Sequence, residues 1–337
     1  MSETKHKFRY MLPPGTNFQF VPKFKAWIWL SVVLTIATIA ILFVNKSVRG
    51  DYMNWTIDFK GGTELVMAFQ QNDAPVRVDA AAVRKAFEAA GEHALEIGEM
   101  HFTDGDTSVD GMIVKTSKVL RGDALGKQYE QILEEALPGT DVRIVQSASV
   151  GAKAGDKLRD DAIKSLIYAI ALIMLYLAFR FDIRYAPGAA FAVIHDAVMV
   201  IGVFALTWTE VSLTTVAALL TVMGYSVNET VISFDRIREN EQKLKEMSLE
   251  RIIDISINER LTRTIMTAST VFATTLIMNI FGAGLVKNFA FAMNIGVIVA
   301  TYSSIFLAAP IFLWISKKWY SGPPRRGRGA PPPAAQE

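Results

Sequence analysis

The fold is decided by the stretch Gly224-Tyr-Ser-Val-Asn-Glu-Thr-Val-Ile-Ser-Phe-Asp-Arg-Ile-Arg-Glu239, in which a carboxylate interrupts a long apolar run. From Val211 to Phe234 every residue other than Glu229 is uncharged, and a helix of that length can cross a hydrocarbon core of about 30 Å. Asp235, roughly one and a half turns after Glu229, ends the run. Because ionisable groups inside a membrane are costly and mark working sites, Glu229 is the first candidate site residue.

A cation stands at the start of the next apolar run, Thr264 to Val286, where Arg263 is the nearest charge. Consecutive membrane helices run antiparallel, so Arg263 is expected to meet Glu229. Polar residues also recur at helical spacing on both runs, and such stripes are expected to face protein, not lipid. The stripes are Thr214, Thr221, Tyr225, Asn228 and Glu229 on the first run, and Arg263, Thr267, Thr270 and Thr274 on the second. Glu229 and Arg263 form the predicted site, with Asn228 and Asp235 as secondary candidates.

The composition fits a membrane protein with a substantial polar part, since 51% of the 337 residues are hydrophobic. The net charge of +2 is uninformative, and no nucleic-acid partner is expected. The chain has no cysteine, which excludes a disulfide framework and thiolate metal sites. We therefore expect neither a metal nor a cofactor.

Six apolar runs predict an α-helical integral membrane protein with six transmembrane helices. The runs are residues 26–44, 163–179, 186–209, 211–234, 264–286 and 288–316. Lysine and arginine gather before the first run, between the fourth and fifth, and after the last, whereas Lys287 is the one basic residue in the opposite short loops. By the positive-inside rule, both termini are cytoplasmic and residues 45–160 lie on the far side.

The remaining divisions of the chain follow from composition. An N-terminal segment, 1–25, is retained, because the run after it has the length of a spanning helix and no small-residue cleavage pattern. The last five helices form a membrane bundle over residues 161–316, with a cytoplasmic loop at 235–262. A basic, proline-rich tail, 317–337, is expected to be disordered.

The segment 45–160 has the periodicity of a small α+β domain inserted between the first two membrane helices. Strands are predicted at 65–69, 96–102, 111–116 and 141–147, and helices at 79–90 and 125–136. Their order, β-α-β-β-α-β, favours a ferredoxin-like fold. Nothing in the segment has catalytic spacing, so the domain is expected to contact another protein.

Several motifs occur together along the chain: Ile57-Asp-Phe-Lys-Gly-Gly-Thr63, Ala190-Phe-Ala-Val-Ile-His-Asp196, the stretch Gly224 to Glu239, Arg263-Thr264, and Thr301-Tyr-Ser-Ser304. With them the chain resembles the SecD/SecF family of export subunits, in the resistance-nodulation-division superfamily. The resemblance marks six residues as family motif or structural positions: Asp58, Phe59, Gly61, Gly62, Gly224 and Arg236. At position 229 the family usually has aspartate, so the carboxylate here is one methylene longer.

The resemblance implies a function. It implies an accessory subunit, not an enzyme, of the Sec preprotein translocase, which uses the proton-motive force to promote protein export together with a SecD-like subunit. The Sec channel (SecYEG), YajC, the emerging preprotein and membrane lipid are the further partners it implies. The location would be the bacterial inner membrane, with residues 45–160 in the periplasm, and protons would be the coupling ion.

The chemistry of the residues leaves two interpretations of Glu229 open. Desolvation favours its neutral form and a nearby cation its charged form, so it can load and release protons, or it can form a permanent structural ion pair. Asp196 in the third helix is a secondary candidate, either for proton passage or for a structural contact with Asn279 or Asn294. Its neighbour His195 projects about 100° away, so the two are not expected to face one site.

Two other classes of function remain. An exporter of small molecules or lipids from the same superfamily would share the buried charges, although such pumps repeat the six-helix unit and this chain has one unit. An intramembrane enzyme would need a catalytic pair, for which His195 and Asp196 are the available residues.

Overall fold

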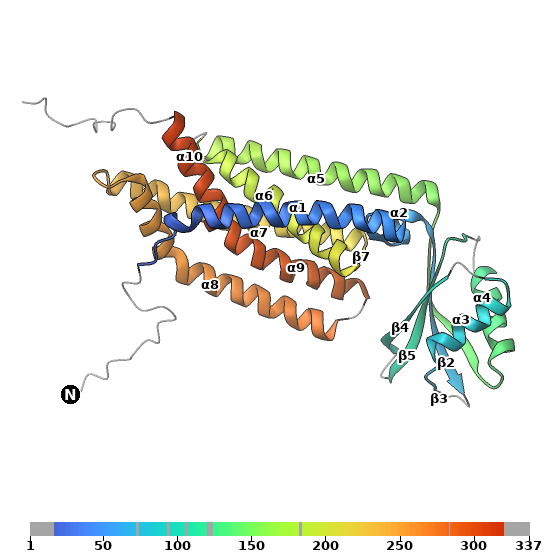
Figure 1. The fold of residues 1–337 in the computed structure, drawn as a ribbon. Coiled ribbons are helices and arrows are strands. Elements are labelled where there is room, and N and C mark those ends of the chain that lie inside the picture. Colours follow the sequence, from blue (N-terminus) through green and yellow to red (C-terminus); the bar gives the residue numbers. More distant parts are fainter. Residues whose placement is uncertain are drawn as a thin grey trace, which may run out of the picture.

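The computed structural model describes residues 17–71, 74–92, 95–104, 107–119, 124–181, 184–282 and 284–319. A bundle of long helices makes up most of the molecule, and a small α+β domain lies at one end of it (Figure 1). The start of the first helix and the end of the last lie at the other end of the bundle. The α+β domain and these two helix ends therefore lie at opposite ends of the bundle.

Within these ranges the structure has six helical spans long and apolar enough to cross a membrane, which confirms the predicted number. The spans are formed by α1 (Phe24–Arg49) preceded by η1 (Val21–Lys23), α5 (Ala152–Arg180), α6 (Ala186–Thr207), α7 (Leu213–Lys243), α8 (Leu249–Phe281), and α9 (Gly284–Ser303) continued by η2 (Ser304–Ala308) and α10 (Ala309–Trp319). The π-turn η2 lies just before Pro310, which lacks the N–H group that a regular helix would use there.

Local sequence explains where the two central helices begin. Ser212 caps α7 by accepting from the Thr215 backbone N–H at 3.4 Å, and the Thr215 hydroxyl accepts in return from the Ser212 N–H at 3.2 Å. Ser248 caps α8 through the Arg251 N–H. Both helices therefore start at a hydroxyl residue that satisfies otherwise unpaired backbone donors.

The segment predicted as a cytoplasmic loop, 235–262, is largely helical. Helix α7 continues to Lys243 and α8 begins at Leu249, so only residues 244–248 lie outside the helices. Charged side chains led the sequence analysis to assign a loop, whereas the helices extend beyond their apolar sections. The predicted tail also begins later than expected, since Lys317 and Lys318 still belong to α10 and residues 320–337 lie outside the described ranges.

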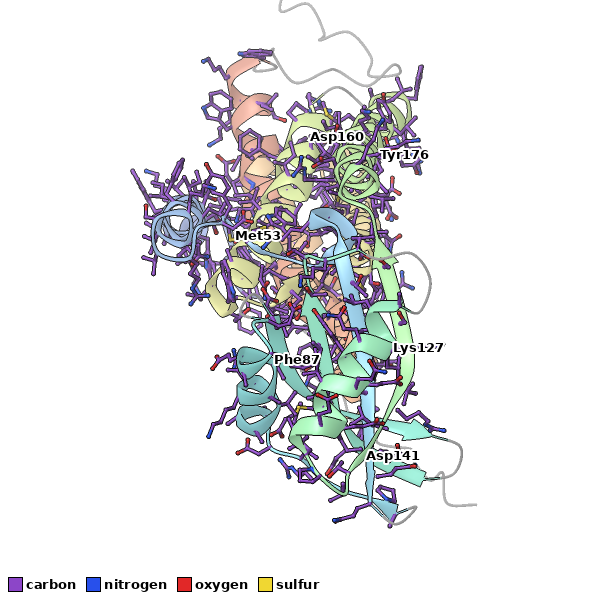
Figure 2. All side chains as sticks on the ribbon, turned by 90° about the vertical axis from the view of Figure 1, so that its right-hand side faces the viewer. Met53, Phe87, Lys127, Asp141, Asp160 and Tyr176 are labelled. Atoms are coloured by element: carbon purple, nitrogen blue, oxygen red, sulfur yellow. The ribbon has the colours of Figure 1, made fainter. Side chains whose placement is uncertain are left out.

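The α+β domain contains every predicted strand and helix. They are β2 (Gly62–Gln71), β3 (Ala74–Pro75), α3 (Ala80–Ala89), β4 (Leu95–Asp104), β5 (Thr107–Thr116), α4 (Ala124–Ala136) and β6 (Asp141–Val150). The four long strands lie in the order β6-β2-β5-β4, and all neighbours are antiparallel. Leu65, Met67 and Phe69 of β2 pack against Phe87 of α3 and Tyr129 of α4 to form the core. Figure 2 labels Phe87 on its helix beside the sheet.

A junction that the sequence did not predict joins this domain to the bundle. The two-residue strand β1 (Asn54–Trp55) pairs in parallel with β7 (Glu210–Val211), which lies in the turn between α6 and α7. Lys115 of β5 forms an ion pair with Glu210 and lies 3.6 Å from the carboxylate of Glu64. Burial raises the pKa of Glu64, and the charge of Glu210 adds to this effect against the opposing effect of Lys115. The domain is thus attached through β1, which precedes its sheet in the chain, and through Lys115, a cation between two carboxylates.

Replacing this cation is expected to loosen the junction. In Lys115→Met the half-buried Glu64 and Glu210 lose their shared partner, at a cost of about 1 kcal/mol, which corresponds to roughly fivefold faster amide exchange. The amide to follow by hydrogen exchange is that of Thr56, which donates to the Val211 carbonyl at 3.0 Å. Lys118→Met, which removes a more exposed pair with Glu92, is the control. Equal exchange at Thr56 in both variants would contradict this role of Lys115.

Candidate functional site

A buried ion pair joins α7 and α8 near the middle of α7. The Nη2 atom of Arg260 lies 3.2 Å from Oε2 of Glu229, and the two side chains are 9% and 3% exposed. Removing water from both charges is expensive, so such a pair persists only where further hydrogen bonds complete it. Glu229 therefore has a buried cation beside it, which belongs to Arg260 and not to the predicted Arg263.

Three further groups hold the guanidinium of Arg260. Its Nη1 donates to the backbone carbonyl of Glu229 at 3.2 Å and to the hydroxyl of Ser233, and its Nη2 donates to Thr264 Oγ1 at 3.1 Å. Ser233 and Thr264 lie one turn beyond Glu229 and Arg260, on α7 and α8. The planar fork of arginine thus connects two helices through both side-chain and backbone acceptors.

The expected contact between Glu229 and Arg263 is wrong. Arg263 is exposed on α8, and among the described residues its side chain has no hydrogen bond or ion pair. Arg260 was counted as a loop charge because the helix was expected to begin at Thr264. One signal in the sequence could have identified it: Ser256, Arg260 and Thr264 are spaced at i, i+4 and i+8, which continues a polar stripe backwards into the charged segment.

A second buried carboxylate lies between α6, α7 and α9. Asp196 is fully buried, and its Oδ2 accepts from Ser226 Oγ at 2.6 Å and from Ser303 Oγ at 2.8 Å. Ser226 precedes Glu229 by three residues on α7, so the α7 residue that binds Asp196 lies about one helical turn from Glu229.

His195 takes part in the same cluster, contrary to the expectation that adjacent side chains would face apart. Its Nδ1 lies 3.2 Å from Asp196 Oδ1, and its Nε2 lies 2.9 Å from the hydroxyl of Tyr302, which contacts Ser31 Oγ at 3.1 Å. Helix α6 is surrounded by α1, α7 and α9, so the side chains of His195 and Asp196 both face other helices although they project in different directions. The cluster thus extends from α7 to α1.

The expected contacts of Asp196 with Asn279 or Asn294 are also wrong. Asn294 accepts from Thr275 Oγ1 at 2.5 Å, and Asn279 donates to the Lys287 carbonyl at 3.1 Å. Serine hydroxyls of α7 and α9, and not the asparagines, donate to Asp196. Short side chains suffice because the helices approach closely; a Cβ atom on Gly296 of α9 would lie 2.1 Å from the side chain of Val222 on α7.

The motif residues near the first strand have structural contacts. Asp58 Oδ2 accepts from the backbone N–H of Leu213 at 3.0 Å, which places a carboxylate at the N-terminus of α7. Phe59 is buried, and a Cβ atom on Gly61 would lie 2.7 Å from Cα of Ala152 at the start of α5. Gly61 and Gly62 have φ values of 76° and 128°, which other residues rarely adopt. This motif therefore fixes the junction to α5 and α7.

The other predicted site residues lie apart from the ion pair. Asn228 and Gly224 are exposed on α7. Asp235 lies 3.3 Å from Arg180 of α5, and Arg236 donates to Glu259 of α8 at 2.6 Å. The last two contacts belong to the end of the bundle remote from the α+β domain.

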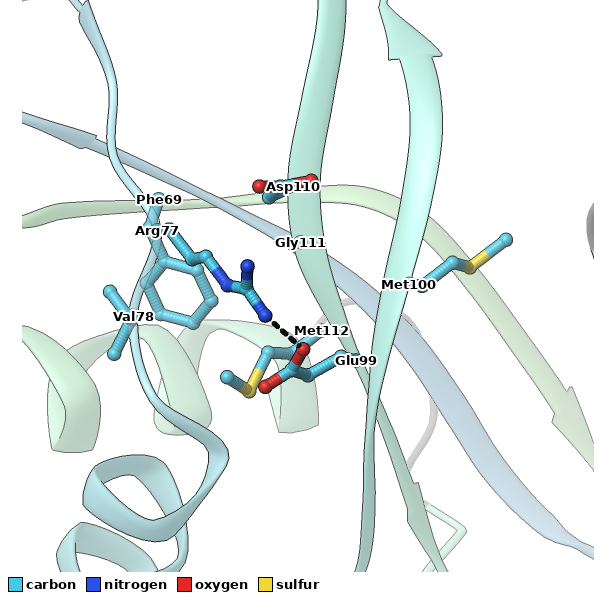
Figure 3. Close-up of a pocket in the computed structure, with 8 residues that line it drawn as sticks. All are labelled: Phe69, Arg77, Val78, Glu99, Met100, Asp110, Gly111 and Met112. Atoms are coloured by element: carbon cyan, nitrogen blue, oxygen red, sulfur yellow. Dashed lines mark hydrogen bonds and ion pairs between the residues drawn. The ribbon is translucent and has the colours of Figure 1, made fainter.

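A surface cavity of the α+β domain lies away from these clusters (Figure 3). Phe69, Val78 and Met112 line it, and Arg77 Nη2 forms an ion pair with Glu99 at 2.7 Å across it. The pair is well exposed, so it is expected to contribute little to stability. The two buried carboxylate clusters of the bundle are the better candidates for a working site.

Comparison with known proteins agrees with this architecture. The family model described as "Protein export membrane protein SecD/SecF, C-terminal" matches residues 128–318. The protein translocase subunit SecF of Gemmatimonas aurantiaca is 38% identical over 90% of this chain and 89% of its own length, and that of Rhodobacter capsulatus is 34% identical over 90% and 91%.

A solved structure is similar over nearly the whole chain. The crystal structure of SecDF, a translocon-associated membrane protein from Thermus thermophilus, superimposes with a TM-score of 0.76 at 28% identity. The match covers 91% of this chain and 40% of that one, so this chain spans less than half the length of the solved protein. With six membrane spans and these relatives, the chain is a multi-pass membrane protein that belongs to the SecD/SecF family of protein-export membrane proteins.

Proposed function

We propose that this chain is an accessory, non-enzymatic subunit of the Sec preprotein translocase, and that proton movement through Glu229 drives its contribution to export. The observation that carries the proposal is the buried pair of Glu229 and Arg260 between two membrane-spanning helices of an export-family protein. A proton that binds Glu229 removes one of the two charges, so the pair is sensitive to the proton gradient.

The surroundings of Arg260 favour proton loading and release at Glu229 over a permanent structural ion pair. In a permanent structural ion pair, the Arg260 guanidinium would depend on the Glu229 carboxylate as its acceptor. Arg260 also donates to the Glu229 carbonyl, to Ser233 and to Thr264, and none of these acceptors is lost when the carboxyl group is protonated. The cost of leaving a buried cation unpaired is therefore reduced in the protonated state, which allows Glu229 to change charge without unfolding the site.

A SecD-like chain is the proposed partner. Arg263, Thr270 and Thr274 of α8 are exposed in this chain, although each lies on a membrane-spanning helix. The two threonine hydroxyls are bonded to backbone carbonyls of α8, so the charge of Arg263, which is costly to expose to lipid, is what indicates a protein neighbour on this face. The SecDF relative, of which this chain covers 40%, supports a partner that supplies the remaining part.

The orientation follows from the positive-inside rule. We place the end that contains Arg180, Arg236 and Arg251 in the cytoplasm of a bacterial inner membrane and the α+β domain in the periplasm. The strand order and the two helices on one face support a ferredoxin-like fold for that domain. There it is positioned to meet a preprotein that emerges from SecYEG, with YajC as a further partner of the complex.

Substitution of Glu229 tests the relay. Glu229→Gln keeps the size of the side chain but does not titrate, so export driven by an imposed proton gradient is expected to fall to the level without a gradient. Glu229→Asp should retain much of the activity. The measurement is export into vesicles at matched levels of membrane-inserted protein.

Glu239→Gln is the matched control, because Glu239 lies on the same helix but is half exposed, and it should leave gradient-driven export unchanged. Gradient-driven export at the unmutated rate in Glu229→Gln would show that this carboxylate is not the proton carrier.

The partner surface is tested by photo-crosslinking in the membrane. A photoreactive residue at Thr270 is expected to form a crosslink with the SecD-like chain, because a polar position facing the membrane should be covered. A photoreactive residue at Leu172, an exposed apolar position of α5, is expected to react with lipid. Crosslinks to the partner from Leu172 but not from Thr270 would contradict the proposed interface.

A further inference from the structure

The two outer strands of the α+β sheet differ at their free edges. β6 has a register shift opposite Val66 and Met67, and Glu130 Oε1 of α4 accepts from the Ile144 backbone N–H at 3.0 Å. A bulge and a side-chain cap of this kind protect an edge strand against further pairing. β4, of 10 residues, pairs with β5 without a register shift, and in the described part of the chain no other element forms backbone hydrogen bonds with it. The outer edge of β4 is therefore open.

The register shows which backbone groups of β4 point outward. One row across the sheet consists of Glu99, Met112, Met67 and Ile144. In an antiparallel sheet the N–H and C=O of a residue point to the same side, so a residue that bonds to one neighbour in the row does not bond to the other. The Ile144 N–H points away from Met67, toward α4, so Met67 bonds to Met112 and the backbone groups of Glu99 point away from the sheet. Every second residue of β4 on either side of Glu99 thus presents a donor and an acceptor at the open edge.

The open edge lies in an acidic part of the domain. Residues 86–114 contain seven aspartates and glutamates and neither lysine nor arginine. Glu96 and Glu99 of β4 are exposed, and the ion pair of Glu99 with Arg77 is itself well exposed (Figure 3). Like charges on neighbouring strands destabilise their pairing, whereas opposite charges stabilise it. The edge therefore disfavours a second copy of β4 and favours a strand that carries lysine or arginine.

The side chains along β4 favour a partner that binds and leaves. Permanent interfaces between subunits are rich in apolar and aromatic residues and poor in aspartate and glutamate. Here the apolar Leu95 and Ile97 pack into the core of the domain, and the exposed residues between and beyond them are Glu96 and Glu99. Pairing at an open edge depends on backbone hydrogen bonds, which an extended polypeptide of almost any sequence can form. An unfolded chain in transit has these backbone groups available.

We propose that the outer edge of β4 binds an extended segment of an exported polypeptide that carries lysine or arginine, and that the segment adds to the sheet as a further strand. The proposal rests on the function proposed above and names what the α+β domain of that subunit binds. Backbone hydrogen bonds to alternate residues of β4 hold the segment, and the acidic side chains beside the edge select basic residues in it.

Peptide binding tests the proposal on the purified complex with its SecD-like partner in phosphatidylcholine nanodiscs. The probe is a fluorescein-labelled ten-residue peptide of alternating lysine and valine, and the measurement is fluorescence anisotropy. This peptide should bind at least tenfold more tightly than a peptide of alternating glutamate and valine, and empty nanodiscs should not bind it. Equal binding of the two peptides, or binding of neither, would overturn the proposal.

A backbone change at the edge tests strand addition. Glu99→Pro removes one outward N–H and no bond between β4 and β5, because proline is tolerated on an edge strand where its nitrogen faces solvent. Glu99→Ala is the matched variant, since both changes remove the ion pair with Arg77 but alanine keeps the N–H. The basic peptide should bind at least fivefold more weakly to Glu99→Pro than to Glu99→Ala. Equal affinities would show that the peptide does not add to this edge.

Charge reversal tests the same site without a change to the backbone. Glu96→Lys should weaken binding of the basic peptide at least threefold. Glu135→Lys makes the same change of net charge at an exposed position of α4 and should leave binding unchanged. An equal effect of the two variants, or no effect of either, would contradict a binding site at β4.

Photo-crosslinking identifies the occupant in the membrane. A photoreactive residue in place of Glu96 is expected to crosslink to an exported chain arrested in transit, whereas one in place of Glu135 is not. Crosslinks from position 96 that reach only the SecD-like chain, or that do not reach the arrested chain, would overturn the proposal.

Failure of this proposal and failure of the proposed function are distinguishable, because peptide binding requires no proton gradient. If Glu229→Gln were fully active in gradient-driven export, the proposed role of Glu229 would fail, while the peptides would still decide the role of β4. If the two peptides bound equally and Glu229→Gln lost gradient-driven export, the proposed function would stand without this binding edge.

Discussion

Arg260 and Glu229 impose the strongest constraint on the bundle, because two opposite charges buried in a membrane must meet each other and must have their remaining hydrogen bonds satisfied. Their contact fixes the relative height of α7 and α8. It also requires a short polar neighbour on each helix one turn away, which Ser233 and Thr264 provide. The apolar surface that surrounds the pair can vary in detail, whereas these positions must be polar.

Helix α7 makes polar contacts with other parts of the molecule at both ends and in its middle. At one end Asp58 and Ser212 cap it, and β7 pairs with β1 just before the α+β domain. Its middle contains Ser226 and Glu229, which belong to the two buried carboxylate clusters. Near its other end, Asn240 contacts α8. Glu229 therefore lies on the helix whose first turn is also attached to the segment that leads into the α+β domain.

Much of the fold could be predicted because local periodicity determines it. The strands and helices of the α+β domain follow alternating or helical apolar patterns, and Asp79 marks the start of α3 by accepting from the Ala81 N–H. The membrane spans follow from length and hydropathy. Glu229 was found for the same reason, since a single charge in an apolar run is visible without any knowledge of contacts.

The missed features depend on residues far apart in the sequence. Arg260 was assigned to a loop because charge alone was used to end the membrane helix, although the helix continues past its apolar section. The β1–β7 junction joins two-residue strands separated by the whole α+β domain and two helices, and strands so short have no periodicity. The partners of Asp196 come from α7 and α9, so only the packing of the helices brings them together.

A double-mutant cycle on Glu229→Gln and Arg260→Met tests the central pairing most directly. Arg260→Met leaves the Glu229 carboxylate buried without its cation and is expected to cost on the order of 3 to 5 kcal/mol of unfolding free energy, measured by denaturant titration from bicelles. Glu229→Gln should cost less, because Arg260 keeps the Glu229 carbonyl, Ser233 and Thr264 as acceptors. The double change should cost less than the sum by about 2 to 3 kcal/mol. The same cycle with Arg263→Met should be additive. Additive effects for Arg260, or a coupling of that size for Arg263, would contradict the pairing of Glu229 with Arg260.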